Sequence, residues 1–415
     1  MRSRKMDDMD ATGRGRTENI LMRGCSAPLD PLEIAKRLLY LPPTPEASGA
    51  VDRELVEDLV ADIFRMHIPT PASIELAQTI RFMLVQGYVH RDPAKPATWR
   101  RIYSSIGEHA ACSSIQLGAV VTGVSGAGKS TAIERALQLF PQVVRHTSMP
   151  GLAAPNPQLL WLKVDIPSSG KIRDLVGSLA RATDEALGTS CERELFSDRR
   201  QSGTELAHRW LKKVSCNFLG VLVLDEVQNL FKIQTKAVRT AKSSRSTSGP
   251  PALRIVDDEA LKFLLTLSNS AKIPTLYCAT PDGTAALSTR MSTAQRMLTA
   301  GFHTIPHALS ADDDFFRKRL FPVLCRYQWF PRRLVPSDEL RRLVFDLSGG
   351  VPRLTMMLWF HATRRVLQRR GDGLSLDDFV HASEHALAPL RPAVQALMSD
   401  DPRLMQQYED LMASI

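Results

Sequence analysis

Apolar residues gather in four short runs along the middle of the chain, and runs of this kind are typical of strands buried on both faces. The four runs are residues 115–121, 158–166, 221–224 and 273–280. The first two are followed by segments with helical spacing of apolar residues, at 131–140 and 171–187. This alternation predicts an α/β fold in which a parallel sheet is flanked by helices.

Helical patterns continue on both sides of this region. Before it, an amphipathic segment at 51–67 is followed by a second predicted helix at 72–86. Thr70 is a favoured N-cap residue and Pro71 is favoured at the first helical position, so the pair marks the start of this helix. After it, Ser337 is expected to cap one helix and Gly349-Gly350 to end it. The predicted later helices are 312–326, 337–347, 352–370 and 376–388.

Residues 123–130, Gly-Val-Ser-Gly-Ala-Gly-Lys-Ser, match the phosphate-binding pattern GxxxxGK(S/T) without a mismatch. They lie between a predicted strand and a predicted helix, which is the context this motif needs. Glycines let backbone N–H groups turn inward around phosphate oxygens. Lys129 is expected to reach the β- and γ-phosphates of ATP, and the Ser130 hydroxyl to bind Mg²⁺. The predicted nucleotide-binding residues are Gly123, Ser125, Gly126, Ala127, Gly128, Lys129, Ser130 and Thr131.

Two adjacent carboxylates, Asp225 and Glu226, follow the apolar run 221–224. Ligands of α/β sheets bind just beyond such strand ends. Asp225 suits an outer-sphere hold on Mg²⁺, and Glu226 suits polarisation of an attacking water. The pair favours an ATP hydrolase over a small-molecule kinase or a GTPase. The alternative is a strand that ends in an acidic helix cap, which the phosphate loop upstream disfavours.

Two further polar residues are candidates for contacts with the γ-phosphate. Thr280 ends the fourth apolar run and precedes the turn Pro281-Asp282-Gly283, although an ordinary strand-end threonine is the alternative. Arg353 begins a predicted helix and could point back at the nucleotide, although an exposed helix arginine is the alternative.

Charge, cysteine spacing and hydropathy narrow the possible partners of the protein and its cellular compartment. The chain has 415 residues, a net charge of +9 and a pI of about 9.4, which favours a polyanionic partner. Its six cysteines show no CxxC spacing, so we expect a reducing cytosol with neither disulfides nor a zinc site, and Cys278 reads as a small buried hydrophobe. No apolar run approaches the roughly 18 residues of a membrane-spanning helix, and the polar N-terminus is not a secretory signal.

We divide the chain into a flexible N-terminal arm (1–50), a helical preamble (51–114), a nucleotide-binding core (115–308), a helical lid (309–389) and a C-terminal tail (390–415). A Lys/Arg-rich segment at 232–253 interrupts the core and reads as a flexible basic loop. This segment either contacts the phosphate backbone of a nucleic acid or is a solvated surface insertion.

The combination of the phosphate loop, Leu224–Leu230, Thr280 and the Gly-Gly-Val-Pro-Arg entry to the lid resembles the AAA+ ATPases. A narrower resemblance is to TnsC, the target-selection ATPase of Tn-seven-like transposons, and to its relative TniB. The segments that carry it are Leu224–Leu230, Leu265–Pro274, Arg326–Phe330 and the tail Leu390–Leu411.

The resemblance implies a regulator that binds ATP and Mg²⁺ and assembles as a ring or helical filament on double-stranded DNA without sequence preference. It further implies recruitment of a TnsB-like transposase with a TnsA-like partner, and loading by a TnsD- or TniQ-like target-recognition protein. We therefore expect a cytoplasmic bacterial protein, nucleoid-associated when on DNA, with no membrane partner.

The family assigns the first sensor to Thr280 and the second to Arg353. A neighbouring subunit should donate an arginine, for which Arg296 is the choice and Arg290 the reserve. Cys278-Ala279-Thr280 departs from the usual Gly-Thr ending, and the basic insertion is long, so the route of target choice, by a DNA reader or an RNA-guided complex, stays open. The alternatives are a signalling or defence switch that never touches DNA and a replication-type loader.

Overall fold

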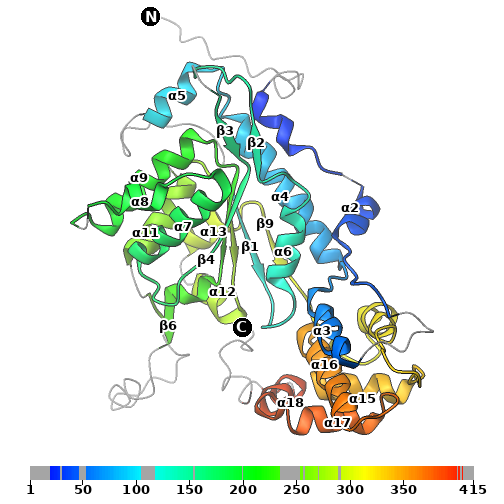
Figure 1. Ribbon diagram of the computed structural model, residues 1–415. Helices are drawn as coiled ribbons and strands as arrows, with labels where there is room; N and C mark the ends of the chain where they lie inside the picture. Colours follow the sequence, from blue (N-terminus) through cyan, green and yellow to red (C-terminus); the bar gives the residue numbers. More distant parts are fainter. Residues whose placement is uncertain are drawn as a thin grey trace, which may run out of the picture.

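The predicted parallel sheet forms the centre of the computed structural model (Figure 1). The structure describes residues 19–28, 30–45, 53–103, 117–152, 155–198, 200–233, 253–255, 258–269, 271–287, 291–399, 401 and 404. Five strands pair in the order β4-β5-β8-β1-β9, and every pairing is parallel. In chain order they are β1 (Gly118–Thr122), β4 (Trp161–Asp165), β5 (Val221–Asp225), β8 (Thr275–Cys278) and β9 (Gly301–Thr304).

The strand order brings the candidate residues together. Strand β8 lies between β1 and β5, with Val121 opposite Cys278 and Leu224 opposite Tyr277. The three strands therefore end at the same edge of the sheet. The phosphate loop follows β1, the Asp-Glu pair ends β5, and Thr280 follows β8 at this edge.

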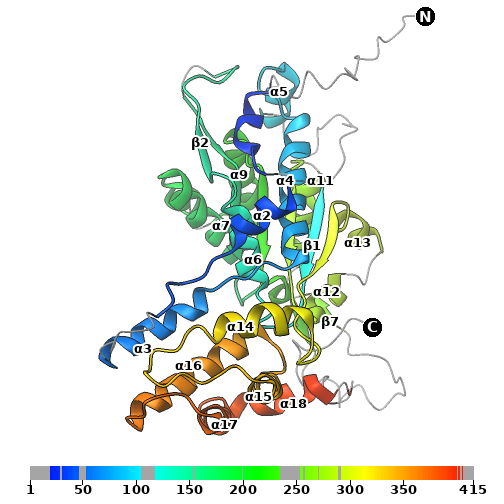
Figure 2. The ribbon, with the colours of Figure 1, turned by 90° about the vertical axis from the view of Figure 1, so that its right-hand side faces the viewer.

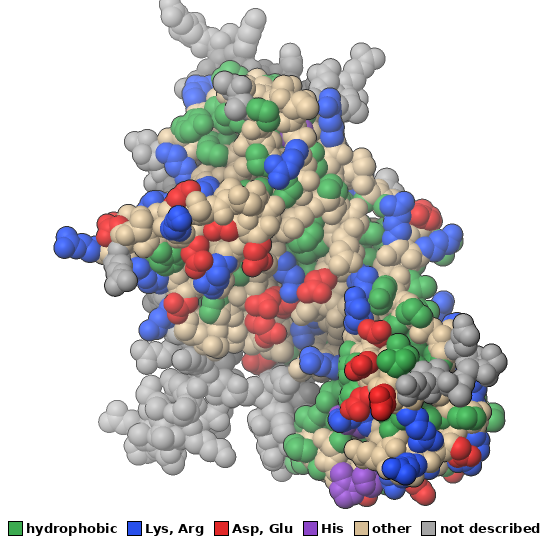
Figure 3. Space-filling model, viewed as in Figure 1, with side chains coloured by type: hydrophobic (Ala, Val, Ile, Leu, Met, Phe, Trp, Pro, Cys, Tyr) green, Lys and Arg blue, Asp and Glu red, His purple; other side chains and the backbone are tan. Residues whose placement is uncertain are grey.

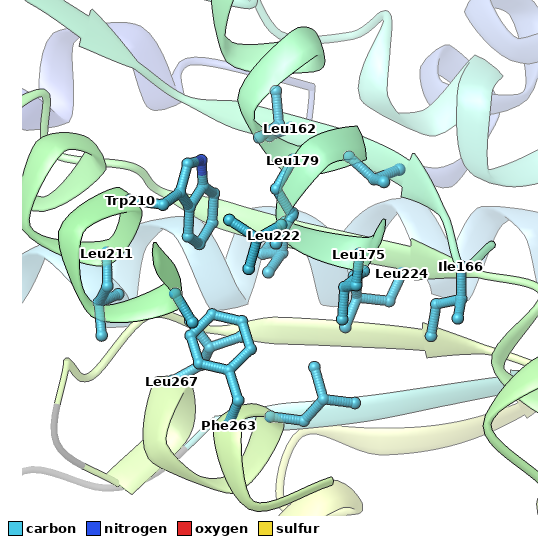
Figure 4. Packing of buried hydrophobic residues seen from close by; sticks show 14 of the residues in the cluster. Leu162, Ile166, Leu175, Leu179, Trp210, Leu211, Leu222, Leu224, Phe263 and Leu267 are labelled. Atoms are coloured by element: carbon cyan, nitrogen blue, oxygen red, sulfur yellow. The ribbon is translucent and has the colours of Figure 1, made fainter. Parts of the chain in front are cut away.

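Alternate side chains of the strands bury against helices on opposite faces, as a sheet covered on both sides requires. Leu222 and Leu224 point into one cluster, whereas Val221 and Val223 point into the other. Figure 4 shows the first cluster, in which Trp210 packs edge-on against Phe263. Its helices are α7 (Ile172–Leu187), α9 (Gly203–Cys216) and α11 (Asp258–Asn269), and those of the opposite face are α4 (Pro71–Val89) and α6 (Lys129–Leu137).

The N-terminal segments differ from the prediction of a flexible arm and a separate preamble. A short 3-10 helix, η1 (Ile20–Cys25), and α2 (Pro31–Leu38) bury Leu21 and Ile34 against the core. The helical pattern at 51–67 is present as α3 (Arg53–Ala61) and η2 (Asp62–Arg65), but its apolar face packs in the lid cluster. Helix α4 instead packs on the core, so no separate preamble forms among the described residues.

The lid forms a third hydrophobic cluster beneath the core (Figure 2). The predicted cap is confirmed, because Leu340 N donates to Ser337 Oγ at 3.1 Å. The predicted stop is confirmed as well, because Gly349 has a left-handed φ of 60°. The lid elements are the π-helical turn η4 (Phe316–Leu320), α14 (Phe321–Leu324), α15 (Asp338–Ser348), α16 (Pro352–Gln368), α17 (Leu376–Glu384), η5 (Ala388–Leu390) and α18 (Arg391–Ser399).

Smaller elements complete the described fold. The ends of the predicted basic loop pair as antiparallel strands β6 and β7, and residues 234–252 between them lie outside the described residues. Among the described helices, none combines the length and the hydropathy that crossing a bilayer requires. The remaining elements are α5 (Pro96–Tyr103), β2 (Val143–Arg145), β3 (Pro157–Leu159), α8 (Cys191–Leu195), η3 (Val227–Leu230), β6 (Phe231–Ile233), β7 (Leu253–Ile255), α12 (Pro281–Leu287) and α13 (Met291–Met297).

Candidate functional site

Glycines give the phosphate loop its shape between β1 and α6. Gly123, Gly126 and Gly128 have φ values of 151°, 81° and 97°, which strain residues that carry a Cβ. A Cβ on Gly123 would also lie 2.5 Å from the carbonyl oxygen of Ile305. A Cβ on Gly128 would meet nothing within 4 Å, so the loop keeps open space there. The loop thus has the backbone geometry of a phosphate cradle.

Lys129 lies within this loop. Its Nζ donates to the carbonyl oxygens of Gly123 at 2.8 Å and Val124 at 3.2 Å. The next residue, Ser130, lines the same cavity as Asp225, and its hydroxyl helps to hold the pKa of the Asp225 carboxyl group below its usual value. The cation, the hydroxyl and the carboxylate that the sequence predicted to act together are therefore adjacent in space.

Asp225 is held from several sides at the end of β5. Only 3% of the residue is exposed, and its Oδ1 accepts the backbone N–H of Glu226 at 3.0 Å. Burial alone would raise its pKa, but hydrogen bonds from Cys278 and Ser130 and the charge of Lys163 outweigh burial, and the pKa lies below its usual value. Asp225 is therefore an ionised carboxylate with a fixed orientation.

Glu226 follows at the edge of the cavity. Its φ of 57° is left-handed, which is uncommon for a residue other than glycine and is typical of functional sites. Burial and, after it, the neighbouring charge of Asp225 raise the pKa of its carboxyl group. Gln228 Nε2 donates to Glu226 Oε2. A carboxylate with a raised pKa is a stronger base than an ordinary glutamate, which suits activation of water.

Thr280 follows the end of β8, as predicted, and its hydroxyl oxygen is buried. The residue is 7% exposed, and its buried Oγ1 has no hydrogen-bond partner. Its backbone N–H donates to Gln228 Oε1 at 3.4 Å. A buried hydroxyl without a partner is costly, so the site holds an unused polar group beside Glu226.

Two residues that the sequence did not assign to the site contact Asp225. Lys163, on β4, is 17% exposed on its side chain, and its Nζ lies 3.3 Å from Asp225 Oδ2, 3.1 Å from Glu134 Oε1 and 3.3 Å from Asp165 Oδ1. Cys278 is buried, and burial, followed by the charge of Asp225, raises the pKa of its thiol, which therefore stays protonated and can donate to Asp225. Cys278 is thus more than the small hydrophobe predicted.

Arg353 begins α16 and joins the lid to the phosphate loop. Its backbone N–H donates to the carbonyl oxygen of Gly126 at 3.2 Å. A Cβ built on Gly126 would lie 3.1 Å from the Cβ of Arg353, so the loop and the lid touch at this point. The Arg353 side chain is exposed and lines the cavity, as a second sensor requires.

These elements enclose a cavity of about 690 Å³ between the core and the lid. Figure 3 shows acidic side chains gathered at the end of the core that faces the lid. His67 also lines the cavity, and burial, aided by Arg135, lowers its pKa to about 4, so the ring is uncharged at neutral pH. The apolar lining includes Phe64, Ile68, Pro306, Phe315, Leu320 and Met356.

The residues present fit a nucleoside triphosphate with Mg²⁺. The glycine cradle and Lys129 suit the phosphates, Ser130 and Asp225 supply hard oxygen atoms, and the apolar lining residues suit a base. All predicted nucleotide-binding residues from Ser125 to Thr131 line this cavity, together with Asp225, Glu226, Thr280 and Arg353.

Arg296 is placed elsewhere. It lies on α13, its side chain is exposed, and it is not among the residues that line the cavity of its own chain. A residue that acts on a neighbour's nucleotide must be exposed in this way, so its role in trans stays a prediction. Arg290, the reserve choice, lies outside the described residues.

Comparisons with known proteins agree with this geometry. A family model described as an AAA domain matches residues 115–287. No curated protein was found to match the sequence. The chain is similar to the solved structure of the Aeropyrum pernix Orc1 protein in complex with DNA, at 16% identity and a TM-score of 0.46, covering 83% of this chain and 72% of that one.

A second similar structure is Cdc6p from Pyrobaculum aerophilum, at 14% identity and a TM-score of 0.44, covering 78% of this chain and 70% of that one. A third is a Walker-type ATPase of Pyrococcus abyssi, at 12% identity and a TM-score of 0.37, covering 70% and 73%. These likenesses concern the fold alone. The phosphate loop and the parallel five-stranded sheet, within the region that the AAA domain model matches, show that the chain has the AAA+ P-loop fold.

Proposed function

We propose that the protein hydrolyses ATP in the cavity between core and lid. The observation that carries the proposal is that Ser130, Asp225 and Glu226 line one cavity, which unites a phosphate-loop hydroxyl, a metal-binding carboxylate and a base. The direct test is release of phosphate from ATP, with and without Mg²⁺, alongside titration with a fluorescent ATP analogue. Absence of nucleotide binding would contradict the proposal.

Each residue has a distinct part in this mechanism. Backbone N–H groups of residues 125–130 and the Lys129 ammonium hold the phosphates. Ser130 and Asp225 would hold Mg²⁺, which neutralises phosphate charge when bound. Glu226 orients a water and accepts its proton as the oxygen bonds to the γ-phosphorus; the bond from the γ-phosphorus to the β–γ bridging oxygen breaks, and ADP leaves with that oxygen. Thr280 and Arg353, which line the same cavity, are proposed to contact the γ-phosphate.

At a finer level, we propose that this ATPase regulates DNA transposition in the manner of TnsC. The support is the resemblance of Leu224–Leu230, Arg326–Phe330 and the C-terminal tail, together with a net charge of +9. In the structure, Tyr327 joins the lid to the N-terminal segment through a bond to the carbonyl oxygen of Pro42 at 2.7 Å, and Gln328 holds Leu334 at 2.7 Å. The Arg326–Phe330 segment is therefore part of the lid's framework.

Binding to duplex DNA is expected to require ATP or a slowly hydrolysed analogue, to be largely independent of sequence and to weaken steeply with salt. Contacts between cations and phosphates release counterions, so the affinity should fall at least about tenfold between roughly 50 and 200 mM salt. Fluorescence anisotropy with ATP, an analogue and ADP measures this. A flat salt response or equal binding with ADP would contradict the expectation, and no binding in any state would favour a protein switch.

An arginine supplied in trans makes hydrolysis depend on assembly. We expect Arg296→Ala and Glu226→Gln each to hydrolyse ATP slowly, and a mixture of the two proteins to recover part of the activity. Recovery follows because some interfaces pair an intact Glu226 with an intact Arg296. The measurement is phosphate release as a function of mixing ratio. If the mixture stays slow while Arg290→Ala is slow and recovers on mixing, the acting arginine is Arg290.

We propose that the end of the C-terminal tail, residues 400–415, binds the transposase; of this segment only residues 401 and 404 are among the described residues. Val394 and Ala396 of α18 are buried, and α18 contacts α15, so Ala396 is not a free docking anchor. Deletion of residues 400–415 is therefore expected to leave ATP and DNA binding intact and to abolish capture of the cognate transposase. Pull-down with full-length and shortened protein checks this. Retention of the transposase by the shortened protein would show that docking lies elsewhere.

A further inference from the structure

Gln228 connects two parts of the site that the proposed mechanism treats separately. Its Nε2 donates to Glu226 Oε2, and its Oε1 accepts the backbone N–H of Thr280 at 3.4 Å. We propose that Gln228 is a positioning residue, which fixes the Glu226 carboxylate relative to the end of β8 and so places the base for hydrolysis. This inference rests on the proposed ATPase function.

The packing around η3 supports this role, because it fixes the backbone that carries Gln228. On one side, α12 lies directly on η3, since a Cβ on Gly283 would be 2.9 Å from the Cβ of Gln228 and 3.1 Å from its Cα. On the other side, Asn229 Nδ2 donates to the carbonyl oxygen of Ile166 at 2.7 Å. With its backbone held between α12 and β4, the Gln228 side chain has a defined origin for its two contacts.

A glutamine amide suits this position chemically. It donates with one end and accepts with the other, so a single side chain satisfies both Glu226 and the Thr280 N–H. The donor carries no charge, so Glu226 remains a net negative base, unlike a carboxylate paired with Lys or Arg. A carboxylate also has spare acceptor sites, and the bond to one oxygen leaves capacity for an attacking water.

The bridge has a mechanical consequence. Glu226 is exposed and follows a left-handed backbone turn, so its side chain alone would adopt several rotamers. Through Gln228, the carboxylate is tied to the residue whose unpartnered hydroxyl lies at the end of β8. Movement of the Thr280 backbone would then be transmitted to the base.

Two substitutions separate the two ends of the bridge. Gln228→Met keeps the length of the side chain and removes both hydrogen bonds. Gln228→Glu keeps an acceptor for the Thr280 N–H but replaces the donor to Glu226 with a like charge. Gln138→Met is the matched control, because Gln138 is a glutamine at the end of α6 that accepts from Arg135 at 3.4 Å and does not line the cavity.

Gln228→Met and Gln228→Glu are each expected to lower kcat for ATP hydrolysis by about tenfold or more, since hydrogen bonds to charged groups are the stronger ones. The Kd for ATP should stay within about a factor of two, because the phosphate loop is unchanged. In a Glu226→Gln background, Gln228→Met should have no further effect on the residual single-turnover rate. A kcat for Gln228→Met close to that of the Gln138→Met control, or an equal loss in both backgrounds, would overturn the proposal.

Amide hydrogen exchange tests the bridge without nucleotide or activity. The Thr280 N–H should exchange faster in Gln228→Met than in the native protein, and close to the native rate in Gln228→Glu. Unchanged exchange in Gln228→Met would show that the contact is not maintained in solution and would overturn the inference. Failure of the native protein to hydrolyse ATP would instead contradict the proposed function, so the two failures are distinguishable.

Discussion

Lys129→Ala is expected to abolish ATP binding and every assembly that depends on ATP. The Lys129 ammonium lies within the phosphate loop, 2.8 Å from the carbonyl oxygen of Gly123. Its charge-assisted bonds to phosphate are worth about 3 kcal/mol, which corresponds to roughly a hundredfold loss of affinity. Titration with a fluorescent ATP analogue measures the effect.

Lys171→Ala is the matched control, because this exposed lysine precedes α7 and its side chain makes no capping hydrogen bond. The control should bind ATP as the native protein does, and both variants should melt at nearly the native temperature. Near-native ATP affinity in Lys129→Ala would place the nucleotide elsewhere and remove the basis of the proposed mechanism.

The sequence was a good guide to the core and a poor guide to its surroundings. Apolar runs predicted the strands because buried parallel strands are apolar on both faces, as Val221–Leu224 are. The segment at 51–67 was correctly predicted to be helical, but an amphipathic pattern does not say which apolar surface it will cover. In the structure α3 covers the lid. Helix α9 was not predicted, although Ser202 and Glu205 form a capping box that signals its start.

The residues of the candidate site likewise fall into those that the sequence identified and those that it did not. The phosphate loop and the Asp225-Glu226 pair are contiguous, so their spacing alone identified them. Lys163 could not be found, because its contact with Asp225 depends on the pairing of β4 with β5. Cys278 looked apolar because its hydrogen bond to Asp225 exists only when β8 lies beside β5. Side-chain contacts across strands follow from register, which local sequence does not specify.

Glu226→Gln is expected to retain ATP binding and to lose hydrolysis, whereas Lys129→Ala is expected to lose ATP binding itself. The amide keeps the size of the side chain and leaves Ser130, Lys129 and Asp225 in place, so the ATP Kd should change little. General bases contribute about a hundredfold or more to rate, so kcat should fall by at least that factor. Assemblies on DNA should consequently persist longer, because DNA binding is proposed to require ATP and this variant keeps its ATP bound.

The decisive comparison for Glu226→Gln is phosphate release in a single turnover, measured beside ATP affinity. Glu192→Gln is the matched control, since Glu192 pairs with Arg181 on the surface and lies outside the cavity lining. Normal turnover in Glu226→Gln would show that another group activates the water. Loss of ATP binding would show instead that the glutamate supports the nucleotide. Partial burial and the charge of Asp225 raise the pKa of Glu226, so its carboxylate is a stronger base than an ordinary glutamate. Normal turnover in Glu226→Gln would show that catalysis does not use this basicity.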